Sequence, residues 1–216
     1  MERLVRKLLA GVIASFVLAG CFQSVNEGEV DAGSPINSRT PRTCGAPGEG
    51  IKFYPWRPEL HDCATFAGNL EVTVPVRTVD LREAERIRAI DGTLFITDNS
   101  SLRDLHGLES LERVGNLMLA TNSELADVRA LSSLEAAEDV TIYLNPTLGS
   151  LEGFGGLRRV HHLVIIDNVA LQSLAGLSSL QTITGDLRLR GNDSLSSAQI
   201  QAFLGRVTVE GSVFRQ

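Results

Sequence analysis

Residues 94–102, LFITDNSSL, decide the fold of this chain, because their pattern returns at intervals of 23 residues. When segments are numbered from zero at Gly92, Gly115, Glu138 and His161, positions 2, 4, 10, 13, 16, 19 and 22 are always apolar. Only 43% of the chain is hydrophobic, so composition does not explain this agreement. A fixed period of this length predicts a solenoid of stacked coils.

Position 7 of each segment is asparagine. After a slip of one residue, a fifth copy begins at Gly185, and the five asparagines are Asn99, Asn122, Asn145, Asn168 and Asn192. A single asparagine here would be an ordinary surface turn residue, because its side chain readily bonds turn backbone. Five in register predict instead a stacked ladder that satisfies polar groups which repeated turns would otherwise bury unpaired.

The other repeat positions predict the path of each coil. Alternation at positions 2 and 4 is typical of a short strand with two side chains inward. The later leucine spacing of three fits a short helical or 3₁₀ return. Position 15 is small wherever coils must approach closely, and the residues there are Gly107, Ala130, Gly153 and Gly176.

Both ends of the repeat are expected to be capped. A degenerate first copy begins at Gly68, so residues 68–195 form the repeats and residues 44–67 an N-terminal cap. Residues 196–216 are expected to form a helical C-terminal cap, in which Ser196 and Gln199 make a capping-box pair and Val207 to Val209 add an edge strand. The predicted fold is a β-rich solenoid, similar to a right-handed β-helix or leucine-rich repeat, of about five to six coils with a disulfide-bearing N-terminal cap.

The first twenty residues have the pattern of a secretory signal peptide. A basic start is followed by a short apolar stretch, residues 8–20, and then by Cys21. Leu18-Ala19-Gly20-Cys21 resembles the bacterial lipobox, and this resemblance implies a cysteine that carries a diacylglyceryl group and an N-acyl chain such as palmitate. The alternative is an ordinary buried cysteine in a hydrophobic helix. Phe22 stands where an aspartate often retains lipoproteins in the inner membrane, which favours anchoring in the outer membrane.

Residues 21–43 are then the lipidated cysteine and a flexible tether, rich in Gly, Ser, Asn and Pro. With Cys21 lipidated, Cys44 and Cys63 are left as a pair in an oxidising compartment, which predicts a disulfide. A zinc site is the alternative, but His61 is the only histidine near them.

The unit Gly-x-Leu-x-Ile-x-x-Asn-x-x-Leu-x-x-Leu-x-Gly-Leu-x-x-Leu resembles the receptor L-domain family, and its core L-x-L-x-x-N-x-x-L resembles the leucine-rich repeat. The resemblance covers about residues 68–195. It implies a short right-handed solenoid that presents a surface to a binding partner.

The sequence offers no pattern typical of catalysis, of a metal site or of a cofactor. His61, His106, His161 and His162 lack metalloprotease spacing, and one of the adjacent pair His161-His162 is expected to point inward or along the strand edge. No nucleophile elbow, phosphate loop or dinucleotide fingerprint occurs. The net charge of −6 gives no basic face for nucleic acid, and no apolar run reaches 18 residues.

Positions 3 and 5 of each copy are expected to face solvent, because strand side chains alternate. They predict an apolar strip that ends in two arginines. Its residues are Phe95, Met118, Tyr143, Val164, Ile166, Arg188 and Arg190. Exposed apolar strips tend to bind partners, although a cap or the tether could cover this one.

The sequence therefore favours a non-catalytic module, anchored in the outer membrane by lipid, that binds a protein or a glycan. A purely structural envelope scaffold is the alternative, and an enzyme ranks third.

Overall fold

The computed structural model describes residues 42–53, 60, 62–73 and 81–215, all within one compact unit, Thr40–Gln216. The predicted signal peptide, Cys21 and nearly all of the tether lie outside the described residues. Among the described helices, none has the length and apolarity that a membrane crossing requires.

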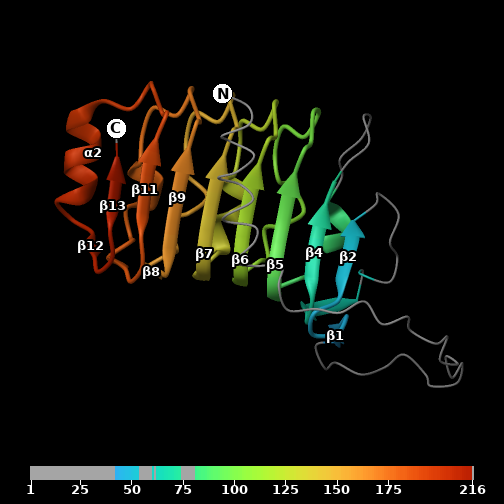
Figure 1. The fold of residues 1–216 in the computed structure, drawn as a ribbon. Helices are drawn as coiled ribbons and strands as arrows, with labels where there is room; N and C mark the ends of the chain where they lie inside the picture. Colours follow the sequence, from blue (N-terminus) through green and yellow to red (C-terminus); the bar gives the residue numbers. More distant parts are fainter. Residues whose placement is uncertain (1–41, 54–59, 61, 74–80, 216) are drawn as a thin grey trace, which may run out of the picture. The chain divides into compact units, whose positions relative to one another are not determined.

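Ten strands join in one sheet in which every pairing is parallel, as Figure 1 shows for the row from β4 to β13. The strands are β1 (Arg42–Cys44), β2 (Gly50–Phe53), β3 (Cys63–Phe66), β4 (Asn69–Val72), β5 (Ala89–Thr97), β6 (Arg113–Ala120), β7 (Ala136–Tyr143), β9 (His162–Ile166), β11 (Leu187–Arg190) and β13 (Val213–Arg215). A second parallel sheet has three short strands, β8 (Arg159–Val160), β10 (Thr182–Ile183) and β12 (Thr208–Val209).

The register of the long sheet confirms the period read from the sequence. Leu94 pairs with Leu117, Leu117 with Val140, and Val140 with Leu163, each one repeat apart. Leu163 pairs with Leu187, so the slip of one residue is absorbed between β9 and β11. The inward residues at positions 2 and 4 are buried, and stacking them coil upon coil builds one continuous apolar core.

Each coil returns to the sheet through a tight turn. Among the described residues, 3₁₀ helices make part of the return at η2 (Arg82–Ala84), η3 (Arg129–Ser133) and η4 (Ala175–Leu177). The coils approach closely at position 15, as predicted. A Cβ on Gly153 would lie 1.8 Å from the Val128 carbonyl oxygen, and one on Gly176 would lie 2.0 Å from that of Leu151. Only glycine fits at such distances.

The asparagine ladder is present and buried. Asn99, Asn122, Asn145 and Asn168 are each 0% exposed. The Nδ2 of Asn122, for example, donates to the Ile96 carbonyl at 2.9 Å and to Asn145 Oδ1 at 3.0 Å. Each amide therefore ties its own turn to the coils on both sides, which satisfies backbone groups that no water reaches.

The residue before each asparagine is left-handed, a feature that the repeat did not predict. The φ angles are 58° at Asp98, 59° at Thr121, 52° at Leu144, 56° at Asp167 and 63° at Gly191. This conformation turns the chain sharply at the end of the strand and aims the asparagine inward. It is costly for a residue with a Cβ, and most of all for the branched Thr121 and the bulky Leu144.

Both ends of the stack are closed by their own elements. At the N-terminal end a disulfide joins Cys44 and Cys63, as predicted, and β1 and β2 extend the parallel stack. At the C-terminal end α2 (Ser197–Leu204) begins with the predicted capping box, and its Phe203 is buried. The predicted edge strand is present as β12, whereas β13 was not anticipated.

Candidate binding face

The outward side chains of the long sheet form two rows, which we call the strand face. The position-3 row runs across β4, β5, β6, β7, β9, β11 and β13 through Glu71, Phe95, Met118, Thr141, Val164, Arg188 and Phe214. The position-5 row starts at Thr73, directly after β4, and runs across β5, β6, β7, β9 and β11 through Thr97, Ala120, Tyr143, Ile166 and Arg190.

All seven residues predicted for the strip lie on this face. Arg190 is exposed, and the other six are half-buried. The strip is not one unbroken row, however. Thr141 separates Met118 from Val164 in the first row, and Ala120, only 6% exposed, precedes Tyr143 in the second. The apolar surface is continuous only because the two rows lie side by side.

Phe214 is a member that sequence reasoning missed. It lies beside Arg188 in the register of β13 on β11, and it is 50% exposed. The Arg188 guanidinium carbon lies 5.0 Å from the centre of the Phe214 ring, within the range of a cation–π contact. The signal was present, since Gly211-Ser-Val-Phe repeats the start of a coil, but the helical cap interrupts the period before it.

Charges lie at the two ends of the strand face. Glu71 lies on β4, where it accepts a hydrogen bond from the Thr73 hydroxyl at 2.9 Å. Arg188 and Arg190 lie on β11, and Arg188 also forms a 3.6 Å ion pair with Asp186. The four strands between them present no charged residue at position 3 or 5.

Tyr143 is the polar group at the middle of the face. Burial raises the pKa of its phenol, and the nearby charge of Asp167 raises that pKa further. The hydroxyl therefore stays neutral at physiological pH and can donate or accept a hydrogen bond toward a partner.

A second polar ladder flanks the strand face at position 1. In it, a side chain of one coil accepts the backbone N–H of the next. Asn69 accepts from Thr93 at 2.7 Å, Asp139 from His162 at 3.0 Å, His162 Nδ1 from Asp186 at 2.7 Å, and Asp186 from Ser212 at 3.0 Å. Hydrogen bonding by Ser212 lowers the pKa of the Asp186 carboxyl, with His162 and Arg188 contributing, against partial desolvation. A polar residue at position 1 of every copy was the signal for this ladder.

The sequence predicts that one of His161 and His162 points inward or along the strand edge; neither points into the core, and the Nδ1 of His162 accepts the N–H of Asp186 on the neighbouring coil. The chain bends at His161, between β8 and β9, so the strict alternation of a strand does not apply there. Neither side chain is buried, and the ring centroids lie 4.1 Å apart.

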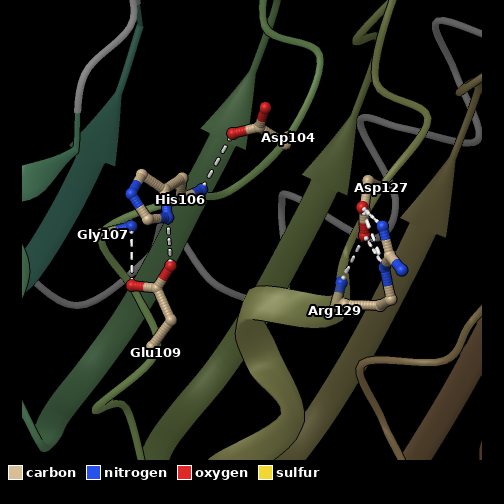
Figure 2. Close-up of polar contacts among 6 residues, drawn as sticks. All are labelled: Asp104, His106, Gly107, Glu109, Asp127 and Arg129. Carbon is tan, nitrogen blue, oxygen red and sulfur yellow. Dashed lines mark hydrogen bonds and ion pairs between the residues drawn. The ribbon is translucent and has the colours of Figure 1, made fainter.

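Figure 2 shows two clusters of charged groups on the return loops, in each of which the contacts drawn join close sequence neighbours. Glu109 contacts the His106 ring and accepts from the Gly107 N–H at 2.8 Å, while Asp127 accepts from the Arg129 N–H at 2.8 Å. The side-chain hydrogen bond from Arg129 lowers the pKa of Asp127. These contacts stabilise turns. Across the described residues, no three histidine, cysteine or acidic side chains gather where they could hold a metal ion.

No protein-family model matches this chain, and a search of curated proteins finds no relative.

Proposed function

We propose that this chain is a non-catalytic binding module of the bacterial cell envelope, held at the outer membrane by lipid on Cys21, and that its strand face binds a protein. The observation that carries the proposal is the side-by-side placement of Phe95, Met118, Tyr143 and Ile166 on neighbouring strands. We also assign the repeats to the leucine-rich-repeat and receptor L-domain type, on the residues that resemble those families.

The sheet beneath the face suits binding. Each strand is in register with its neighbours, and the asparagine ladder joins successive turns from Asn99 to Asn192, so the outward side chains are held in place before a partner arrives. A pre-organised surface loses little conformational entropy on binding. Half-exposed apolar groups with one neutral phenol at the centre are a composition typical of protein interfaces.

A protein suits this face better than a glycan does. Met118, Val164 and Ile166 offer no hydrogen-bonding groups, whereas a sugar brings many hydroxyls that must keep partners when water is removed. A glycan remains the second class of ligand, through stacking on Tyr143 and Phe95.

The test compares partners captured by crosslinking in intact cells. Lysine at Met118 and Tyr143 together places two charges in the apolar middle of the face, and Gln181→Lys adds one at an exposed site beside the other sheet. We expect the face variant to lose its crosslinked partner and the control to keep it. Unchanged partners in a folded face variant would refute the proposal.

The anchor is tested separately. Cys21→Ala should remove acyl incorporation, measured as a mass difference on the mature chain. Retained acylation would refute the assignment of Cys21. A structural spacer is the competing function, supported by the rigidity of the stacked ladders. It predicts abundance similar to that of the envelope scaffold and no partner that depends on the face.

A further inference from the structure

We infer that the protein bound by the strand face is a second copy of this chain, docked face to face with the order of the coils reversed. This inference rests on the proposed function, because it names the partner of the same face. Its grounds are the positions of charge and of side-chain size on six adjacent strands, β4, β5, β6, β7, β9 and β11.

The face has the layout that a two-fold interface requires, in which one patch meets its own copy. The midpoint of the six strands from β4 to β11 lies between β6 and β7. A two-fold axis through this point, parallel to the strands, places β4 opposite β11, β5 opposite β9, and β6 opposite β7 of the partner. The strands of both copies then run in the same direction, so position 3 faces position 3.

Side-chain size is complementary in this arrangement. At the centre, Tyr143 meets the nearly buried Ala120 of the second copy, and Met118 meets Thr141. One strand further out, the large Phe95 meets Val164 and the small Thr97 meets Ile166. Each large side chain at the centre therefore has a smaller one opposite it, which lets two sheets pack about 10 Å apart.

The positions of the charged residues favour one of the two possible two-fold arrangements, in which the order of the coils is either reversed or preserved. If the axis ran along the stack, β11 would meet β11, and Arg188 and Arg190 of both copies would gather at one end. In the reversed order the arginines of the two copies lie a full face apart, roughly 24 Å over five strand spacings, which exceeds the Debye length of about 8 Å. Arg188 then lies opposite Glu71. The separation of the arginines is what favours the reversed order.

The size of the face sets the strength expected. The face spans five strand spacings in one direction and about four residues along each strand in the other, a footprint of roughly 24 by 13 Å. This area is smaller than the about 800 Å² that each partner buries in a standard interface. We therefore expect a weak dimer, with a dissociation constant in the micromolar range or above. Confinement of both copies to one membrane would raise their effective concentration and favour pairing.

The experiment is thiol crosslinking of the full chain in intact cells, with two differently tagged copies. One carries Thr97→Cys and the other Ile166→Cys, and the probe is a bismaleimide that spans about 10 Å, the separation of packed sheets. The reversed order predicts a product that joins the two tags, and little product from Thr97→Cys alone. The preserved order predicts the opposite, because β5 would then meet β5.

Three controls complete the design. The parent chain reports background from its own cysteines, of which Cys44 and Cys63 are already joined. Thr182→Cys, on β10 of the other sheet, should give no product. Adding Tyr143→Lys to both copies should lower the yield of the mixed product about tenfold, since a charge would then face Ala120.

The outcomes separate this inference from the proposed function. If the mixed product is absent and the face variant loses a different protein in the capture experiment, the partner is not a second copy of this chain, and the proposed binding function stands. Strong product from Thr97→Cys alone refutes the reversed order. Absence of any partner that depends on the face refutes both proposals.

Discussion

Replacement of Asn145 by alanine should cost about 4 kcal/mol of folding free energy. Asn145 is fully buried at the middle of the ladder. Its Oδ1 accepts from the backbone N–H of Asn122 at 3.2 Å and from the Asn122 side chain at 3.0 Å. Its Nδ2 donates to the Leu119 carbonyl at 3.0 Å and to Asn168 Oδ1 at 3.2 Å.

The magnitude follows from the groups that alanine leaves without their side-chain partner. They are the backbone N–H of Asn122 and the carbonyl of Leu119, both on the preceding coil, and each buried group left unsatisfied costs about 1–3 kcal/mol. Water cannot replace the lost amide, because the core leaves no path to it. Asn145→Asp should cost at least as much, since a carboxylate keeps the size but cannot donate to the Leu119 carbonyl.

Asn192 provides the matched control. It accepts from Asn168 at 3.1 Å and donates to Ile165 at 2.8 Å, but it is half-buried, so water can take part of its role. Asn192→Ala should therefore cost about 1–2 kcal/mol. The assay is urea unfolding followed by circular dichroism. The reasoning is refuted if both variants lose the same unfolding free energy, or if Asn145→Ala loses less than about 1 kcal/mol. Either result would mean that the asparagine ladder does not stabilise the turns.

Four further predictions follow from particular residues. Leu144→Asn should stabilise the chain by about 1 kcal/mol, because φ is 52° there and asparagine tolerates this region; a lower urea midpoint would contradict it. The phenol of Tyr143 should ionise above its ordinary pKa of 10.0, seen as the part of an ultraviolet pH titration that Tyr143→Phe removes. The pKa of Asp127 is lowered in the folded state, so its contribution to stability is present above the unfolded value of 3.8 and is lost as the pH falls through the folded value. Asp127→Asn should thus make stability slightly less sensitive to pH below about 4, and an unchanged acid slope would argue against it. Replacing Cys44 and Cys63 together by serine should cost about 3 kcal/mol, because their sequence separation of 19 defines the closed loop; unchanged stability would refute this.

The sequence by itself predicted several features that recurring residue types mark. The inward rows, the asparagine ladder, the slip before Gly185 and the close approach at Gly153 all follow from residue types that recur at a fixed offset. Each coil repeats the same contacts with its neighbours, so the same constraint selects the same residue each time, and one pattern encodes both strand and stacking. The capping box at Ser196 was equally visible because it is local.

Only the tertiary structure decided the features that interrupt the period or that no recurring residue type marks. The left-handed residue before each asparagine varies from Asp to Leu to Gly, because a backbone geometry rather than a side-chain contact is repeated there. The bend at His161 depends on how the coils stack at a corner, which no residue type marks, and β13 returns to the sheet after a helical cap that interrupts the period.

The strand face was determined partly by the sequence and partly by the tertiary structure. The alternation of side chains along a strand predicted which residues of β5 to β11 point outward, because successive side chains lie on opposite sides of the sheet. Their arrangement depends on the register between coils, and that register brings Tyr143 next to Ala120, places Thr141 between Met118 and Val164, and adds Phe214 beside Arg188. Outward side chains do not pack against the core of the next coil, so no packing constraint selects the same residue type in every repeat. Which of them lie next to one another is decided only when the coils stack.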